Sequence, residues 1–124
     1  MKLAATISRY LLGLIFVVFG LNGFLHFLPM GPIPPGPGSQ FLEAIVTSHH
    51  FQFVALVQLV SGALFLAGRY VPLALTIIAP VIVNILLFHI LMAPATIAPG
   101  ILVTILWFIV FTRYRPAFAG ILTA

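Results

Sequence analysis

Three side-chain amides lie deep within long apolar runs of this 124-residue sequence: Asn22, Gln58 and Asn84. An amide offers both a hydrogen-bond donor and an acceptor. In apolar surroundings it either joins two helices or binds a polar group of a ligand. Both interpretations stand at this level, with helix joining as the more ordinary one.

Three histidines lie nearer the ends of the same runs: His26, His50 and His89. Imidazole relays protons and binds metal ions, and Glu43 and His49 lie close by in the sequence. No H-x3-H or H-E-x-x-H spacing supports a metal site, so these histidines are weak metal candidates. A haem held by His26 and His89 is favoured still less.

The composition excludes most other chemistry. Cysteine is absent, which excludes disulfides, thiolate nucleophiles and iron–sulfur ligands. Glu43 is the single acidic residue, which excludes paired-carboxylate catalysis and an Asp-oriented triad. The sequence therefore assigns no catalytic residue.

Hydrophobic residues make up 63% of the chain and charged residues only 5%, too few to cover a water-soluble domain. We therefore expect one integral membrane domain, residues 1–124, with an all-α fold. Apolar runs predict a bundle of four transmembrane helices over 10–28, 51–68, 70–92 and 97–112.

The connection between the first two spans is predicted in two parts. Segment 29–40 contains five prolines and three glycines, a composition that argues against a helix and predicts a loop. Segment 41–48 places apolar residues at helical spacing, which predicts a short helix lying at the membrane interface. In the third span, Pro80 is expected to kink the helix.

The net charge of +4 comes from isolated cations rather than from a basic stripe, so nucleic acid is not an expected partner. The cations are Lys2, Arg9, Arg69, Arg113 and Arg115. With four spans, all of them fall on one side of the membrane. The positive-inside rule then places both termini in the cytoplasm, and the Arg-Tyr pairs at 9–10, 69–70 and 113–114 agree, since Tyr prefers the headgroup level.

The polar residues form two layers when their height is measured from Arg9 and Arg69. At about 1.5 Å per residue, the three amides lie about 17–22 Å and the three histidines about 26–30 Å above these arginines. Both layers fall in the outer half of the membrane. They predict an outward-facing polar pocket between the first three spans, while the fourth span, with Trp107, is expected mainly to pack.

Small residues predict which helices approach closely. Gly13, Gly20 and Gly23 lie along the first span. A second group lies in the second span: Ser61, Gly62, Ala63, Ala67 and Gly68. Small residues let helix backbones come together in membranes, so the first two spans are expected to form a close pair.

The segments 9–20 (RYLLGLIFVVFG), with Asn22-Gly23, 59–69 (LVSGALFLAGR) and 84–89 (NILLFH) resemble the DoxX-like family of small four-span membrane proteins. The resemblance implies a multi-pass protein of a prokaryotic cytoplasmic membrane. It also implies association with quinone-linked or other membrane redox systems.

Two functions follow as hypotheses. The first is an accessory or quinone-interacting subunit of a membrane redox system, with a quinone or another lipophilic small molecule as ligand and a membrane or periplasmic redox protein as partner. Its ligand-binding residues would be Asn22, His26, Gln58, Asn84 and His89. The alternative is a non-enzymatic scaffold or homo-oligomer in the lipid bilayer whose amides only join helices.

Overall fold

The computed structural model describes residues 2–28, 34–121 and 123, and within them the fold is entirely helical. The elements are α1 (Lys2–Leu25), α2 (Pro37–Thr47), α3 (His50–Ala67), α4 (Val71–Met92) and α5 (Ala98–Tyr114), with short 3-10 turns η1 (Pro94–Thr96) and η2 (Arg115–Phe118). Four helices are long and apolar enough to cross a membrane: α1, α3, α4, and α5 together with η2. The chain is therefore of the multi-pass membrane class that its composition predicts.

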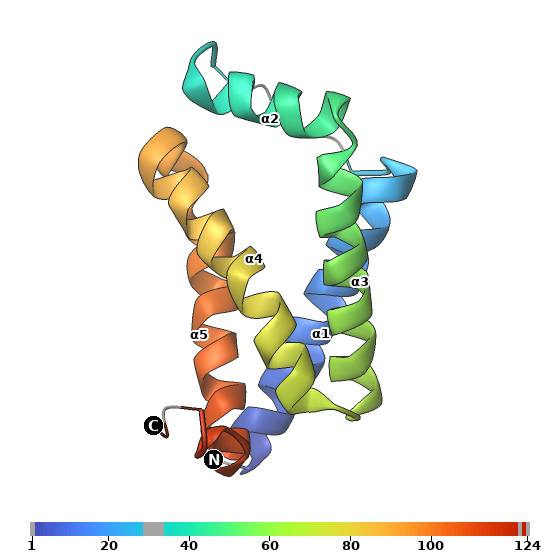
Figure 1. Ribbon diagram of the computed structural model, residues 1–124, viewed down its shortest axis with the longest axis vertical. Helices are drawn as coiled ribbons and strands as arrows, with labels where there is room; N and C mark the ends of the chain where they lie inside the picture. The colour runs from blue at the N-terminus through green and yellow to red at the C-terminus, as the bar shows by residue number, and fades with distance from the viewer. Residues whose placement is uncertain (1, 29–33, 122, 124) are drawn as a thin grey trace.

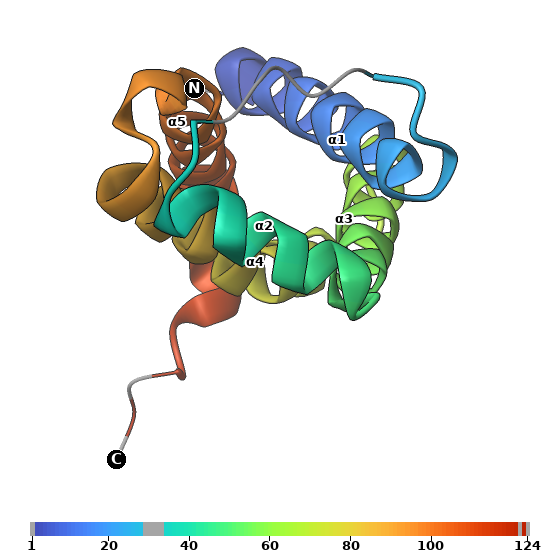
Figure 2. The same ribbon diagram turned by 90° about the horizontal axis from the view of Figure 1, so that it is seen from above.

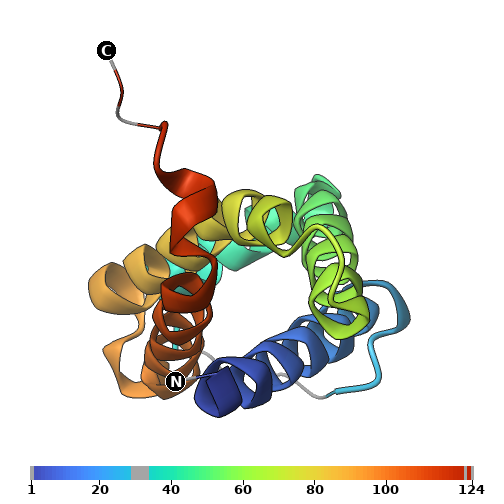
Figure 3. The same ribbon diagram turned by 90° about the horizontal axis from the view of Figure 1, so that it is seen from below.

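The four long helices form a ring in the order α1, α3, α4, α5, and α5 closes the ring against α1. Helix α2 lies across one end of this ring, where it contacts α3 and α4 (Figures 1 and 2). We call this the α2 end. The opposite end carries the start of α1, the turn between α3 and α4, and the end of α5 (Figures 1 and 3), and we call it the terminal end.

Helices α1 and α3 form the most extensive contact of the bundle, and glycine makes it possible. A Cβ atom at Gly20 would lie 2.8 Å from the backbone nitrogen of Leu59, and one at Gly62 would lie 2.7 Å from that of Val17. A Cβ atom at Gly13 would meet the Gly62 carbonyl oxygen at 3.0 Å. The close pairing predicted from the small residues is confirmed.

The apolar core occupies the half of the bundle nearer the terminal end. Its fully buried side chains include Leu12, Phe65, Leu75, Ile78 and Val110. Towards the α2 end, burial declines along the same faces. Phe19 lies on the helix face that carries buried Phe16 and Gly23, yet it is 47% exposed. The α4–α5 pair separates from the α1–α3 pair in this direction, which Figure 1 shows as a widening beneath α2, while α1 and α3 stay packed together at Gly23 and Ala55.

Arg9 fastens the terminal end of the α1–α3 pair. Its Nη1 donates a hydrogen bond to the Phe65 carbonyl oxygen in the last turn of α3. Gly68 follows the end of that helix with a φ of 68°, in the left-handed region, and its backbone N–H donates to the Leu64 carbonyl oxygen at 2.9 Å. A cation beside the carbonyl end of a helix also interacts favourably with the helix dipole.

Some predicted boundaries differ from those observed. The first span begins at Lys2 rather than residue 10, since α1 includes the mixed polar and apolar segment 2–9 that precedes the apolar run. It ends at Leu25 rather than 28. The last helix reaches Tyr114 rather than residue 112. The second and third spans, α3 and α4, agree with prediction to within a residue, and α4 continues through Pro80.

The prediction that segment 29–40 contains no helix is wrong for its last four residues, because α2 begins at Pro37. Proline needs no hydrogen-bond acceptor in the first turn of a helix. The Ser39 hydroxyl donates to the Gly36 carbonyl oxygen at 2.9 Å and accepts from the Gly36 backbone N–H at 3.1 Å, which closes this helix start. Residues 29–33 lie outside the described part of the chain.

Candidate functional site

The amide of Asn22 closes the end of its own helix. Its Oδ1 accepts a hydrogen bond of 2.7 Å from the Leu28 backbone N–H, while the Asn22 carbonyl oxygen accepts one of 2.9 Å from the His26 backbone N–H. The Asn22 side chain thus provides a hydrogen-bond acceptor for a backbone N–H that lies beyond the end of α1. The side chain of Asn22 remains half-buried.

Asn84 also bonds within its own helix. Its Nδ2 donates to the Pro80 carbonyl oxygen at 2.9 Å, and the side chain is exposed on α4. The Oδ1 atom of Asn84 takes no part in this bond. Neither Asn22 nor Asn84 joins two helices through the bonds described here.

Gln58 differs from the other two amides because it lies inside the bundle. It is 7% exposed and shares the buried face of α3 with Ala55, Ser61 and Phe65. Its side-chain amide makes no hydrogen bond to another of the described residues. Its neighbour in sequence, Leu59, abuts Gly20, so Gln58 lies at the height where the core gives way to the more open α2 end.

Ser61 is one helical turn from Gln58 on the same face. It is fully buried at 0% exposure, and its Oγ is the one buried side-chain oxygen or nitrogen without a hydrogen-bond partner among the described residues. Buried hydroxyls normally find a partner, because an unpaired one costs about 1–3 kcal/mol. Sequence reasoning treated Ser61 only as a small packing residue. Its position three residues after Gln58 is the sequence feature that could have shown that both side chains lie on one face of the helix.

The histidines do not converge. His26 is exposed just beyond α1 with φ 51°, and His50 is exposed at the start of α3, after His49 with φ 62°. His89 is half-buried on α4, and its Nδ1 lies 2.8 Å from the Ile85 carbonyl oxygen. That oxygen can only accept, so Nδ1 is the donor in this contact.

Within residues 2–28, 34–121 and 123, no three His or Glu side chains come together in a way that could hold a metal ion. Glu43 is exposed on α2. The geometry therefore gives no support to an outer metal centre made from His26, His50 and His89.

Trp107 connects α5 to α4. Its Nε1 donates to the Leu75 carbonyl oxygen at 3.0 Å, and its ring stacks on Phe111 with centroids 5.3 Å apart. The Leu75 carbonyl is next to that of Thr76 in α4. The Thr76 carbonyl has no helix donor, because residue 80 is a proline without a backbone N–H. The contacts are those of a packing residue, as predicted for the fourth span.

Comparison with known proteins adds no relative. No family model, no curated protein and no solved structure matches the chain. The fold and the contacts of its own residues therefore carry the functional argument.

Proposed function

We propose that the chain is a DoxX-like protein of a prokaryotic cytoplasmic membrane, acting as an accessory or quinone-interacting subunit of a redox system. In this proposal it binds a lipophilic molecule bearing a carbonyl group inside the helix bundle, at Gln58. The α2 end faces outward, both termini lie in the cytoplasm, and α2 lies at the outer membrane interface. The Arg-rich terminal end supports this orientation.

The observation that carries the proposal is the pair of buried polar groups on α3. Gln58 is 7% exposed, and the hydroxyl of Ser61 is fully buried without a partner. Two polar side chains facing the interior of a membrane bundle are costly unless something bonds to them. A ligand carbonyl would accept from the Gln58 amide or from the Ser61 hydroxyl and remove that cost.

The surroundings suit a flat lipophilic ring. Phe16 and Phe65 lie in the buried core on the terminal side, and Phe19 supplies an apolar surface at the height of Gln58. Few polar groups in an apolar site is the usual pattern for small-molecule recognition. A quinone combines an aromatic-like ring with two carbonyl acceptors, which matches this set of residues.

Four further polar residues lie nearer the α2 end: Asn22, His26, Asn84 and His89. In the proposal they line the route by which the ligand's polar head approaches.

The test measures quinone binding to purified protein in nanodiscs by equilibrium dialysis, with a short-chain benzoquinone and a naphthoquinone as probes. Gln58→Leu should weaken binding about tenfold, because a buried donor to the ligand is lost. Ser61→Ala should weaken it less. Gln52→Leu is the matched control, since Gln52 is an exposed amide on the same helix, and it should bind as the wild type does.

Wild-type protein that binds neither quinone, or Gln58→Leu that binds as tightly as Gln52→Leu, would overturn the proposal. The alternative, a non-enzymatic scaffold or homo-oligomer, is favoured by one observation: the Asn84 amide is exposed on α4 and retains a free acceptor. On that alternative, Asn84→Leu shifts the protein from oligomer to monomer in cross-linking, and no quinone binds.

A further inference from the structure

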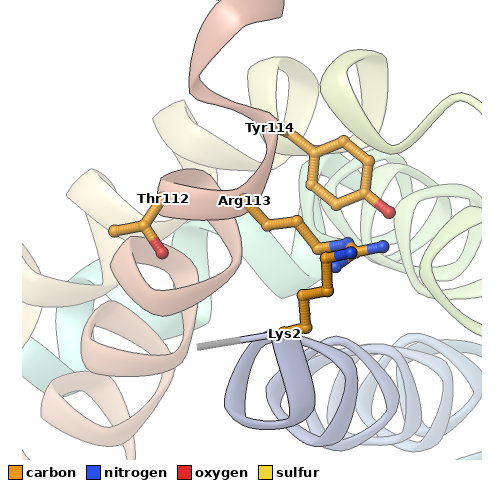
Figure 4. A pocket seen from close by; sticks show the side chains of 4 residues that line it. All are labelled: Lys2, Thr112, Arg113 and Tyr114. Atoms are coloured by element: carbon orange, nitrogen blue, oxygen red, sulfur yellow. The ribbon is translucent and has the colours of Figure 1, made fainter.

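A second group of polar side chains gathers at the terminal end, remote from Gln58. Lys2, at the start of α1, and Arg113, in the last turn of α5, line one open hollow of about 570 Å³ together with Thr112 and Tyr114. Figure 4 shows the Lys2 amine and the Arg113 guanidinium extending towards each other from the two helices, with the Tyr114 hydroxyl on the same side.

The two cations have no acidic side chain to neutralise them. Glu43 is the only Asp or Glu in the chain, and it lies on α2 at the other end of the bundle. Two like charges brought together repel each other unless an anion lies between them. Arg9 differs, because it is already bonded to the Phe65 carbonyl oxygen in α3.

We propose that this hollow binds the phosphate group of an anionic phospholipid. Arg113 offers a planar fork of donors that matches phosphate oxygens, Lys2 adds a mobile point charge, and Tyr114 adds a hydroxyl donor. The Thr112 hydroxyl already donates to the Ile109 carbonyl oxygen at 2.6 Å, so it serves only as an acceptor at the rim. The donors thus come from both α1 and α5.

The position favours a lipid over a phosphate from solution. The hollow lies where two candidate spans end, and Tyr114, which is half-buried with its ring against the core, is a residue type that prefers headgroup level. Basic sites between transmembrane helices bind anionic headgroups in this setting. A bound phosphate would join the start of α1 to the end of α5, which are neighbours in the ring.

The experiment counts lipids retained by the purified protein in native mass spectrometry and titrates them in detergent. Phosphatidylglycerol should bind the wild type, and phosphatidylcholine should bind at least about tenfold more weakly because its net charge is zero. The variant Lys2→Gln/Arg113→Gln should lose about tenfold in phosphatidylglycerol affinity. Lys2→Arg/Arg113→Lys should lose less affinity than this variant, since both charges remain, but should bind more weakly than the wild type, since position 113 loses the guanidinium fork.

The matched control is Arg69→Gln/Arg115→Gln, which removes the same charge from the same end but leaves the four lining residues intact. It should bind phosphatidylglycerol like the wild type. Equal losses in the two double variants would show attraction by net charge alone and overturn the proposal. All variants change exposed side chains, so circular dichroism should show unchanged helix content.

Soluble probes separate the two sources of phosphate. Inorganic phosphate and glycerol 3-phosphate at millimolar concentration should not displace phosphatidylglycerol from the wild type. Suppose instead that one of the two soluble probes binds, that its binding requires Lys2 and Arg113, and that phosphatidylglycerol does not bind. That result would overturn the lipid proposal in favour of a site for soluble phosphate. The absence of lipid and phosphate binding would also overturn it.

Discussion

At the scale of single residues, the α1–α3 contact is the most tightly constrained part of the molecule. Gly20→Ala would place a Cβ atom 2.8 Å from the Leu59 nitrogen and 2.9 Å from the Ala55 oxygen. Both are backbone atoms and cannot rotate away, so the helices must separate. We expect a loss of stability of about 1–3 kcal/mol, measured by reversible unfolding in mixed micelles.

Gly120→Ala provides the control, because a Cβ atom at Gly120 meets nothing within 4 Å. The control should unfold at the same denaturant concentration as the wild type. Equal stability of Gly20→Ala and Gly120→Ala would contradict the close packing of α1 on α3.

The sequence predicted the glycine contact well and the amide contacts poorly, for physical reasons. A glycine has no side-chain rotamer, so its helix face alone determines what it meets. An amide side chain can rotate, so its height along the helix does not determine which hydrogen bonds it makes. Asn22 bonds the backbone at Leu28, and Asn84 bonds the carbonyl four residues before it. Only Gln58 keeps the inward position that the layer predicted.

At the scale of elements, α2 is the helix that begins inside a segment whose composition argued against a helix. A run rich in proline and glycine argues against a helix on average, but Pro37 occupies a first-turn position and Ser39 bonds to Gly36. The four apolar helices were predictable because each needs only length and hydropathy. Helix α2 depends on capping and on contacts with distant segments, which composition does not reveal.

Those contacts attach α2 to α4. The rings of Phe41 and Phe88 lie 5.6 Å apart, and Gly38 is buried beside Met92. Phe41→Ala should therefore release α2 without unfolding the bundle. The expected result is faster amide hydrogen exchange over residues 37–47, with exchange in α3 and α4 unchanged, since local opening needs only the local contacts to be lost.

Val46→Ala is the comparison for this experiment, because Val46 lies on the same helix with nearly the same exposure, 46% against 42% for Phe41, but has no aromatic ring to contact Phe88. It should leave exchange in α2 close to that of the wild type. If Phe41→Ala exchanges no faster than Val46→Ala, the aromatic contact does not hold α2 in place.

At the scale of the whole molecule, the two ends of the ring have different characters. The core is concentrated towards the terminal end, which also carries Lys2 and the four arginines. The α2 end carries the histidines, Glu43 and the less tightly packed helix faces. The same division supports both proposals: a neutral ligand entering beneath α2, and an anionic headgroup held between α1 and α5.

The orientation of this division in the membrane can be tested directly, because the chain contains no cysteine. Ala44 on α2 and Ala117 in η2 are both exposed, so Ala44→Cys and Ala117→Cys should fold normally. We expect a membrane-impermeant maleimide to label Ala44→Cys in intact spheroplasts and Ala117→Cys only after permeabilisation, as the positive-inside rule requires. Ile105→Cys, within α5, should remain unlabelled in both conditions. Labelling of both end positions from one side would contradict the four-span arrangement, whereas the reverse pattern would preserve four spans and place α2 in the cytoplasm.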